Sequence, residues 1–316
     1  MANKQGNPHD VFFKKLLSDT NRSIAFLQEF LPVQMVEVID WSTVHSVDSV
    51  YVHEHLSAYY SDVVFSVALK AQEGLRIRIS LLIEHKSYPD RMVSFQLLNY
   101  LNLGYRQQLS GHKTSTKPFR PELIIPFLFY HGKSKWKPAS LQDFFSSIPA
   151  SLQEYIPTIP FIYEDLKRYS LEALEGIRQS QIKAAVLTWY YGHSKEEVLA
   201  NFSRILGLAG EEEGNFLETV TVYIFSVIKI TEEEFTQTIN DMAEQKKEKV
   251  LTLYDRIVDR GLQQGKRQGL QEGKRQGLHQ GMSEIIQRLS RNGMTELEIA
   301  EATGLSLEQI KLLLEQ

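Results

Sequence analysis

The chain has 316 residues, of which 42 % are hydrophobic, so it can form one large domain with appendages or two domains. A formal net charge of −4 argues against a basic coat for nucleic acid, although a local basic groove is compatible with it. The sequence has no cysteine, which excludes disulfides, thiolate metal sites and cysteine nucleophiles.

The chain begins with the polar stretch MANKQGNPHD, which lacks the apolar segment of a secretory signal. Its longest apolar run, 219–228, is about half of the ~20 residues that a membrane-spanning helix needs. We therefore expect a soluble, cytoplasmic protein.

The first 140 residues alternate between helical and strand patterns. Helical spacing covers 9–31, with a break near 19–21 and an end at Pro32. The patterns that follow predict strands over 36–52, 61–69 and 75–86, a helix from 91 that Asp90 caps, and a strand over 121–133. This order predicts an α/β or α+β core.

The predicted hairpin brings two carboxylates together. If it turns around Glu73, the numbers of facing residues sum to 146, so Asp62 faces Glu84 on the same side of the sheet. Facing carboxylates near a core repel each other and lose hydration unless they share a proton or a cation, and a divalent metal would resolve both costs.

Lys86 lies two residues beyond Glu84 and therefore projects to the same face. Oxygen ligands for Mg²⁺ and a nearby ammonium suit the hydrolysis of a phosphodiester. The alternative is an exposed strand end at which Glu84 and Lys86 form a weak surface pair worth ~0–1 kcal/mol.

Five motifs give a resemblance to a known family. In chain order they are HDVFFKKLL (9–17), YYSDVVFSV (59–67), IEHKS (83–87), FQLLNY (95–100) and PFLFYHGK (126–133). The chain resembles the Rpn, or YhgA-like, recombination-promoting nucleases, often called putative transposases, of the PD-(D/E)XK nuclease superfamily. This resemblance implies a Mg²⁺-dependent DNA endonuclease with a restriction-endonuclease-like α/β core.

The resemblance also implies the site residues. Asp62 and Glu84 would hold the metal together with the main-chain carbonyl of His85, and Lys86 would position the attacking water. Ser61 replaces the proline of the superfamily motif.

Two further positions depart from the family pattern. Lys86 stands where the family commonly has Gln, and Gln96 stands where it commonly has Arg, a change that either compensates for the first or weakens the site. Asp10 is either an accessory acidic residue or, as we prefer, the N-cap of its helix.

We divide the chain into three parts. A nuclease domain covers 1–245, with the catalytic core in about 1–140 and a helical extension in about 141–245; a Gly-repeat segment follows over 246–292, and a helix-turn-helix-like pair over 293–316. A rival interpretation is a DNA-associated regulatory or oligomerising protein that has kept the fold and has weak or no activity.

The Gly-repeat segment contains three octads, GLQQGKRQ, GLQEGKRQ and GLHQGMSE, with a glycine at every fourth position from Gly261 to Gly281. Each glycine costs about 1 kcal/mol relative to alanine in a helix, so a helix here needs a closely packed partner. The segment is therefore either a homo-oligomer interface, which we prefer, or a flexible linker whose basic residues touch phosphate.

The tail is expected to form two helices with capping boxes at Thr295 and Ser306. Its acidic character favours contact with protein over contact with DNA. Two other motifs stay open: His53 and His55 either bind metal or lie on a surface strand, and HGKSKWKP (131–138) either contacts a nucleic-acid strand or is a solvated turn on which Trp136 packs.

Overall fold

The computed structural model describes residues 7–47, 63–70, 78–112, 119–210, 216–240, 242 and 244–314. The chain divides into two compact units, 1–247 and 248–316, which are described separately below. Within the described ranges, none of the helices is long and apolar enough to cross a membrane.

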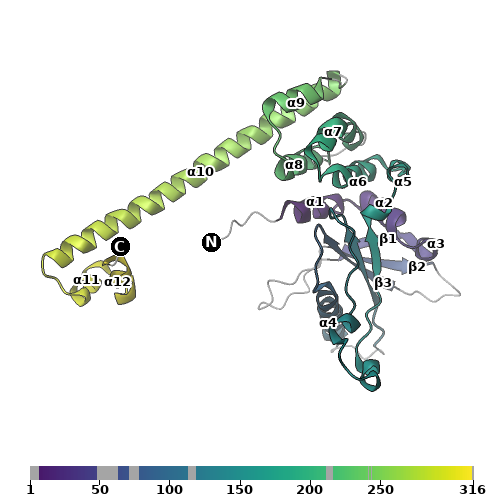
Figure 1. Cartoon of the computed structure of the whole chain (residues 1–316), viewed down its shortest axis with the longest axis horizontal. Helices are drawn as coiled ribbons and strands as arrows, with labels where there is room; N and C mark the ends of the chain where they lie inside the picture. The colour runs from purple at the N-terminus through teal and green to yellow at the C-terminus, as the bar shows by residue number, and fades with distance from the viewer. Residues whose placement is uncertain are drawn as a thin grey trace. The chain divides into compact units, whose positions relative to one another are not determined.

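The first unit is built on a five-stranded sheet of order β1-β2-β3-β4-β5 (Figure 1). The strands are β1 (Ile39–Val47), β2 (Val63–Leu69), β3 (Arg78–Lys86), β4 (Leu123–Tyr130) and β5 (Ile162–Asp165). β1, β2 and β3 pair antiparallel, whereas β3, β4 and β5 run parallel. A mixed sheet flanked by helices confirms the predicted α/β, restriction-endonuclease-like core.

The predicted hairpin register is also confirmed. Val63 pairs with Ile83 and Val64 with Leu82, so the numbers of facing residues sum to 146. The strand predicted from 36 begins only at Ile39, because α3 (Val33–Val38) forms directly after Pro32. β5 was not predicted, since a strand of four residues leaves little room for an alternating pattern.

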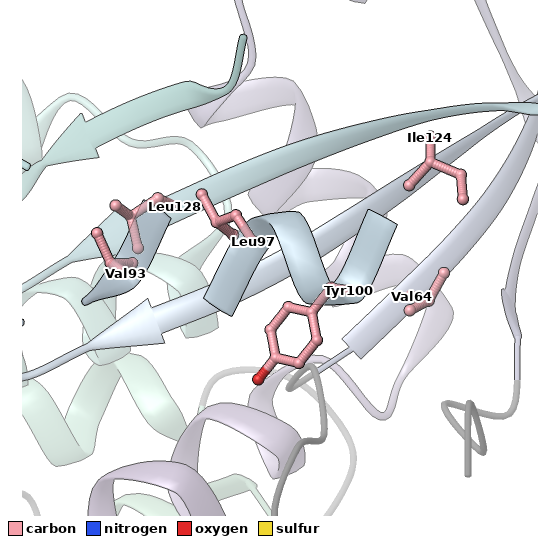
Figure 2. Close-up of a cluster of buried hydrophobic side chains, with 6 residues drawn as sticks. All are labelled: Val64, Val93, Leu97, Tyr100, Ile124 and Leu128. Atoms are coloured by element: carbon pink, nitrogen blue, oxygen red, sulfur yellow. The ribbon is translucent and has the colours of Figure 1, made fainter. Parts of the chain in front are cut away.

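Helix α4 (Val93–His112) covers one face of the sheet. Its Val93, Leu97 and Tyr100 pack against strand residues in one buried cluster, which Figure 2 shows; the strand members are Val64, Ile124 and Leu128. Because side chains alternate along a strand, Glu84, which pairs with Leu128, belongs to this same face.

Aromatic side chains from three helices cover the opposite face. The helices are α1 (Pro8–Leu16), α2 (Thr20–Phe30) and α6 (Ser180–Tyr191). Phe13, Phe26 and Trp189, one from each helix, all lie within ring contact of Phe129 on β4. The break between α1 and α2 falls where it was predicted, with Asp19 as the N-cap of α2.

The predicted N-cap of α1 is wrong. Asn7 caps this helix by accepting a hydrogen bond from the His9 main-chain nitrogen, and Asp10 lies inside the first turn. Pro8 explains the difference, because proline is favoured at the first helical position, directly after the cap.

The region after β4 is mainly helical, as predicted. In chain order it contains η1 (Leu141–Phe145), η2 (Ala150–Tyr155), η3 (Leu166–Arg168), α5 (Leu171–Glu175), α7 (Lys195–Ala209), α8 (Phe216–Val227) and α9 (Glu232–Ile239), with β5 and α6 among them. Helix α8 packs on α1, and α7 packs on α6, so this region extends the cover of the sheet.

The second unit contains most of α10 (Glu244–Arg291) together with α11 (Glu296–Thr303) and α12 (Leu307–Leu314). The Gly-repeat segment is helical up to Arg291, where α10 ends. Ile286, Ile299, Ile310 and Leu313 form a small core between the three helices. Both predicted capping boxes form, and Gly304 ends α11 with a φ of 70°.

Candidate active site

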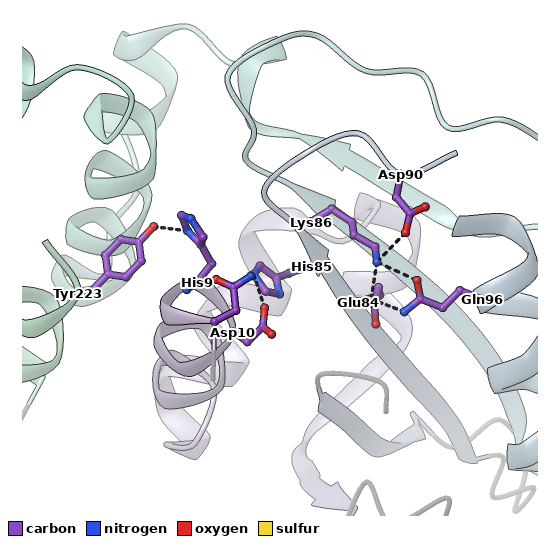
Figure 3. A network of polar contacts seen from close by, with 9 residues as sticks. His9, Asp10, Glu84, His85, Lys86, Asp90, Gln96 and Tyr223 are labelled. Atoms are coloured by element: carbon purple, nitrogen blue, oxygen red, sulfur yellow. Dashed lines mark hydrogen bonds and ion pairs between the residues drawn. The ribbon is translucent and has the colours of Figure 1, made fainter. Parts of the chain in front are cut away.

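The carboxyl end of β3 and the first turns of α4 bring three predicted residues together. Lys86 Nζ lies 3.1 Å from Glu84 Oε1 and donates a hydrogen bond of 2.8 Å to Gln96 Oε1. Gln96 Nε2 in turn donates to Glu84 Oε1 at 2.7 Å. Figure 3 shows this closed triangle of carboxylate, ammonium and amide.

The triangle is largely withdrawn from solvent. The side chain of Glu84 is 6 % exposed and that of Lys86 is 12 % exposed. Burial alone would lower the pKa of Lys86, but the carboxylates of Glu84 and Asp90 outweigh it, so the pKa lies above its ordinary value. The Lys86 side chain is therefore an ammonium at neutral pH, and this strand end does not form the weak, exposed surface pair.

Two residues of this network were missed as site residues. Asp90 was predicted only as a cap; its Oδ1 accepts a hydrogen bond from the Met92 nitrogen, and its Oδ2 lies 3.1 Å from Lys86 Nζ. Tyr100 lies one helical turn after Gln96, whose Nε2 approaches the Tyr100 hydroxyl at 2.5 Å. Gln96 and Tyr100 are four residues apart on one helix, and this spacing was the available signal for Tyr100.

Asp62 lies outside the described residues, as do His53 and His55. The described pairing of β2 and β3 nevertheless reaches the position next to Asp62, because its last pair is Val63 with Ile83. The pairing of Asp62 with Glu84 would be the next step of the same register, and it stays a prediction.

Asp10 belongs to the other face of the sheet. Its Oδ1 lies 3.7 Å from Nε2 of His85, the residue between Glu84 and Lys86, and Figure 3 shows the two groups on either side of the strand. The His85 ring is stacked between Phe13, at 4.7 Å, and His131, at 5.4 Å. Asp10 therefore contacts the side chain of His85, whereas the predicted metal ligand is the main-chain carbonyl of that residue.

Further histidines gather behind this stack. His9 Nδ1 lies 2.8 Å from the Tyr223 hydroxyl, and the His9 and His131 rings are 5.4 Å apart. Burial, followed by the charge of His85, lowers the pKa of His9 to about 4 and holds the pKa of His131 well below its ordinary value. Both rings are neutral at neutral pH and join α1 to the end of β4 and to α8.

The described residues supply only part of a metal site. Among them, no group of three or more His, Asp or Glu side chains is arranged to hold a metal ion. Glu84 and the His85 carbonyl are the predicted ligands inside the described ranges, and Asp62 would be the third. These are oxygen donors, which Mg²⁺ prefers.

The fold and the end of β3 together define the class of protein. It is an α/β protein with a restriction-endonuclease-like core, and it carries a Glu-x-Lys motif at the carboxyl end of a central strand. The family follows from comparison with known proteins. The chain belongs to the family of YhgA-like putative transposases, whose family model matches residues 7–214. The predicted family is therefore confirmed.

The relatives include both nucleases and a protein named as inactive. Recombination-promoting nuclease RpnC of Escherichia coli K12 is 29 % identical over 134 residues, which is 42 % of this chain and 42 % of RpnC. RpnA of the same strain is 32 % identical over 143 residues, or 45 % of this chain and 46 % of RpnA. The similarity thus spans less than half the length of either nuclease.

The inactive recombination-promoting nuclease-like protein RpnE, from the same strain, is 26 % identical over 264 residues, which is 82 % of this chain and 84 % of RpnE. No solved structure matches the chain.

Proposed function

We propose that this chain is a metal-dependent DNA endonuclease that hydrolyses phosphodiester bonds and is linked to DNA recombination. The observation that carries the proposal is the buried Glu84 carboxylate held by Lys86 and Gln96 at the end of β3. Relatives named recombination-promoting nucleases support the reaction class and DNA as substrate.

Charge balance supports a divalent ion as the cofactor. The described part of the site has two carboxylates, from Glu84 and Asp90, and one ammonium from Lys86, a formal sum of −1, and the predicted ligand Asp62 would add a further negative charge. Uncompensated charge is costly at a buried site, and one divalent cation would neutralise it. When bound by Asp62, Glu84 and the His85 carbonyl, Mg²⁺ would polarise a phosphate oxygen and lower the pKa of a water.

The chain's own residues have separate roles in this proposal. Lys86 orients the attacking water and stabilises the negative charge that develops on the phosphate. Gln96 fixes the Glu84 carboxylate and the Lys86 ammonium relative to each other, because it donates to one and accepts from the other. Asp90 holds the ammonium from the side away from Glu84.

Plasmid nicking by the purified protein tests the proposal. We expect nicking with Mg²⁺, none with EDTA, and none from Asp62→Ala or Glu84→Ala. Cleavage by both variants, or cleavage without any divalent ion, would overturn the site.

The second candidate is a protein of the same fold with weak or no activity that regulates or assembles on DNA. It is favoured by the relative named as inactive, which matches 82 % of this chain. If the parent protein binds DNA but does not nick it with Mg²⁺ or other divalent ions, this second candidate is the correct one.

A further inference from the structure

The segment after β4 is a basic loop beside the active site. We define the lysine loop as residues 131–139; its Lys133, Lys135 and Lys137 are all exposed. None of the ion pairs between described residues includes any of these lysines. Three positive charges therefore face solvent.

The lysine loop has a fixed backbone. Tyr130 donates a hydrogen bond of 2.6 Å from its hydroxyl to the Ser134 carbonyl, and Tyr163 does the same at 2.6 Å to the carbonyl of Trp136. The Trp136 ring packs edge-on against both tyrosines, at 5.0 Å and 5.9 Å. Trp136 thus anchors the loop, and the lysines on either side of it point to solvent.

Gly132 makes this packing possible. A Cβ atom at Gly132 would overlap the hydroxyl and ring of Tyr130, so only glycine lets the backbone pass so close to that ring. The close approach keeps the start of the loop against the sheet.

The two ends of the loop connect it to the active site. His131 donates from its main-chain nitrogen to the Lys86 carbonyl at 3.0 Å, and Ser94 of α4 donates from its hydroxyl to the Ala139 carbonyl. Lys86 and Gln96, two residues after Ser94, both belong to the Glu84 network. The loop therefore runs from one side of that network to the other.

The lysine loop also lies on the same face of the sheet as Glu84. Lys86 pairs with Tyr130 in the β3–β4 register, and Trp136 packs on the cluster that contains Leu97 and Leu128. The lysine loop consequently lies on the α4 face of the sheet, which is the face of Glu84. A polyanion that approaches this acidic site needs compensating cations close by, and this loop supplies them.

We propose that Lys133, Lys135 and Lys137 bind backbone phosphates of duplex DNA and hold the duplex against the Glu84 site. This inference rests on the proposed function, since it assumes that DNA is the substrate. The contacts are electrostatic and independent of base sequence, because exposed lysines on one loop offer point charges rather than a base-reading surface.

Binding of a fluorescent duplex in EDTA, measured by anisotropy at several salt concentrations, tests the inference without any cleavage. Each phosphate contact adds about 0.9 to the slope of log K against log salt. We expect Lys133→Gln/Lys135→Gln/Lys137→Gln to lower the slope by about 2 to 3 and the affinity at least tenfold, as an order-of-magnitude estimate. The corresponding triple Lys→Arg variant should keep the slope.

The matched control removes three exposed basic residues outside the lysine loop and the glycine repeat: Arg178→Gln/Lys229→Gln/Lys249→Gln. It should leave the slope unchanged. If the loop variant has the slope of the parent and an unchanged melting temperature, the proposed role of the lysine loop is wrong. The proposed function still stands in that case if the parent nicks DNA. A parent protein that neither binds nor nicks duplex DNA overturns both.

Discussion

Glu84 and Lys86 are bound to each other in the structure, and this pairing determines what their replacement should do. Glu84 also accepts from Gln96, so a change to glutamine keeps the side-chain shape and removes only the charge. The chemistry needs that charge as a metal ligand, and when it is removed Asp90 still pairs with the Lys86 ammonium.

We therefore expect Glu84→Gln and Asp62→Asn to lower the nicking rate by about 100-fold or more while circular dichroism stays unchanged. Binding of Mn²⁺, followed by electron paramagnetic resonance, should weaken in both variants. Glu154→Gln, at an exposed glutamate, is the control and should match the parent in both measurements. Parent-like Mn²⁺ binding by both site variants would contradict the assignment.

Lys86 offers a second test at the residue scale, because the family commonly has glutamine at this position. Glutamine can orient a water but carries no charge, so Lys86→Gln should slow cleavage by about 10- to 100-fold without abolishing it. Lys86→Glu should stop cleavage, since it adds a carboxylate beside Glu84 and Asp90. Single-turnover nicking rates distinguish these variants, and equal rates for Lys86→Glu and the parent would mean that Lys86 has no part in the reaction.

Strand periodicity is a local property, and it placed Glu84 and Lys86 on one face of the sheet. Gln96 entered only as an accessory position through the family resemblance. The sequence assigned Asp10 incorrectly, since the choice between Asn7 and Asp10 as cap depends on where the first helical turn closes. Asp90 could not be recognised as a partner of Lys86, because the turn that folds it back is defined only by three-dimensional packing.

At the scale of elements, the half-buried His9 and the buried His131 join α1 to α8 and to the end of β4. Their lowered pKa values make this junction sensitive to acid. The pKa of His9 is about 4 in the folded chain and 6.5 ordinarily, so as the pH falls below 6.5 the unfolded chain takes up protons first. The contribution of His9 to the free energy of unfolding is therefore complete above pH 6.5, and it is lost as the pH falls toward about 4.

We expect the melting temperature of the first unit to fall between about pH 7.5 and pH 5, and His9→Gln to reduce that fall. Glutamine can still bond to the Tyr223 hydroxyl but does not titrate. His45→Gln is the matched control, because His45 is exposed, and it should keep the full pH dependence. If His9→Gln behaves like His45→Gln, the junction does not set the acid sensitivity.

Elements with a clear periodicity were predicted well, and elements set by context were not. β3 and α4 carry long regular patterns and appear as expected. β5 is recognisable only as the parallel neighbour of β4, and α3 occupies residues whose β-branched composition favours a strand. Pairing with β4 decides β5, whereas α3 forms because a helix begins directly after Pro32.

At the scale of the whole molecule, α10 raises the question of why a helix of 48 residues contains six glycines in its repeat. Among the residues that the structure describes, a Cβ at any of these glycines would meet nothing within 4 Å, so no steric reason for them is found there. Leu262, Leu270 and Leu278, all at least 61 % exposed, lie beside them.

Positions four apart form a ridge that drifts by about 40° per step, and two such ridges can pack when small residues let the backbones approach. Pairing of α10 with the same helix of a second copy through the glycine stripe therefore stays a prediction.

The variant Gly269→Leu/Gly273→Leu tests this pairing. Leucine favours an isolated helix by about 1 kcal/mol per site over glycine, but its bulk would separate two closely packed helices. We expect higher helicity together with a lower molar mass by light scattering. Gln263→Leu/Gln271→Leu is the matched control, because these positions lie about 160° from the neighbouring glycines, on the opposite side of the helix. It should leave the mass unchanged; a parent that is already monomeric, or a glycine variant with the parent's mass, would mean that the stripe is not an assembly surface.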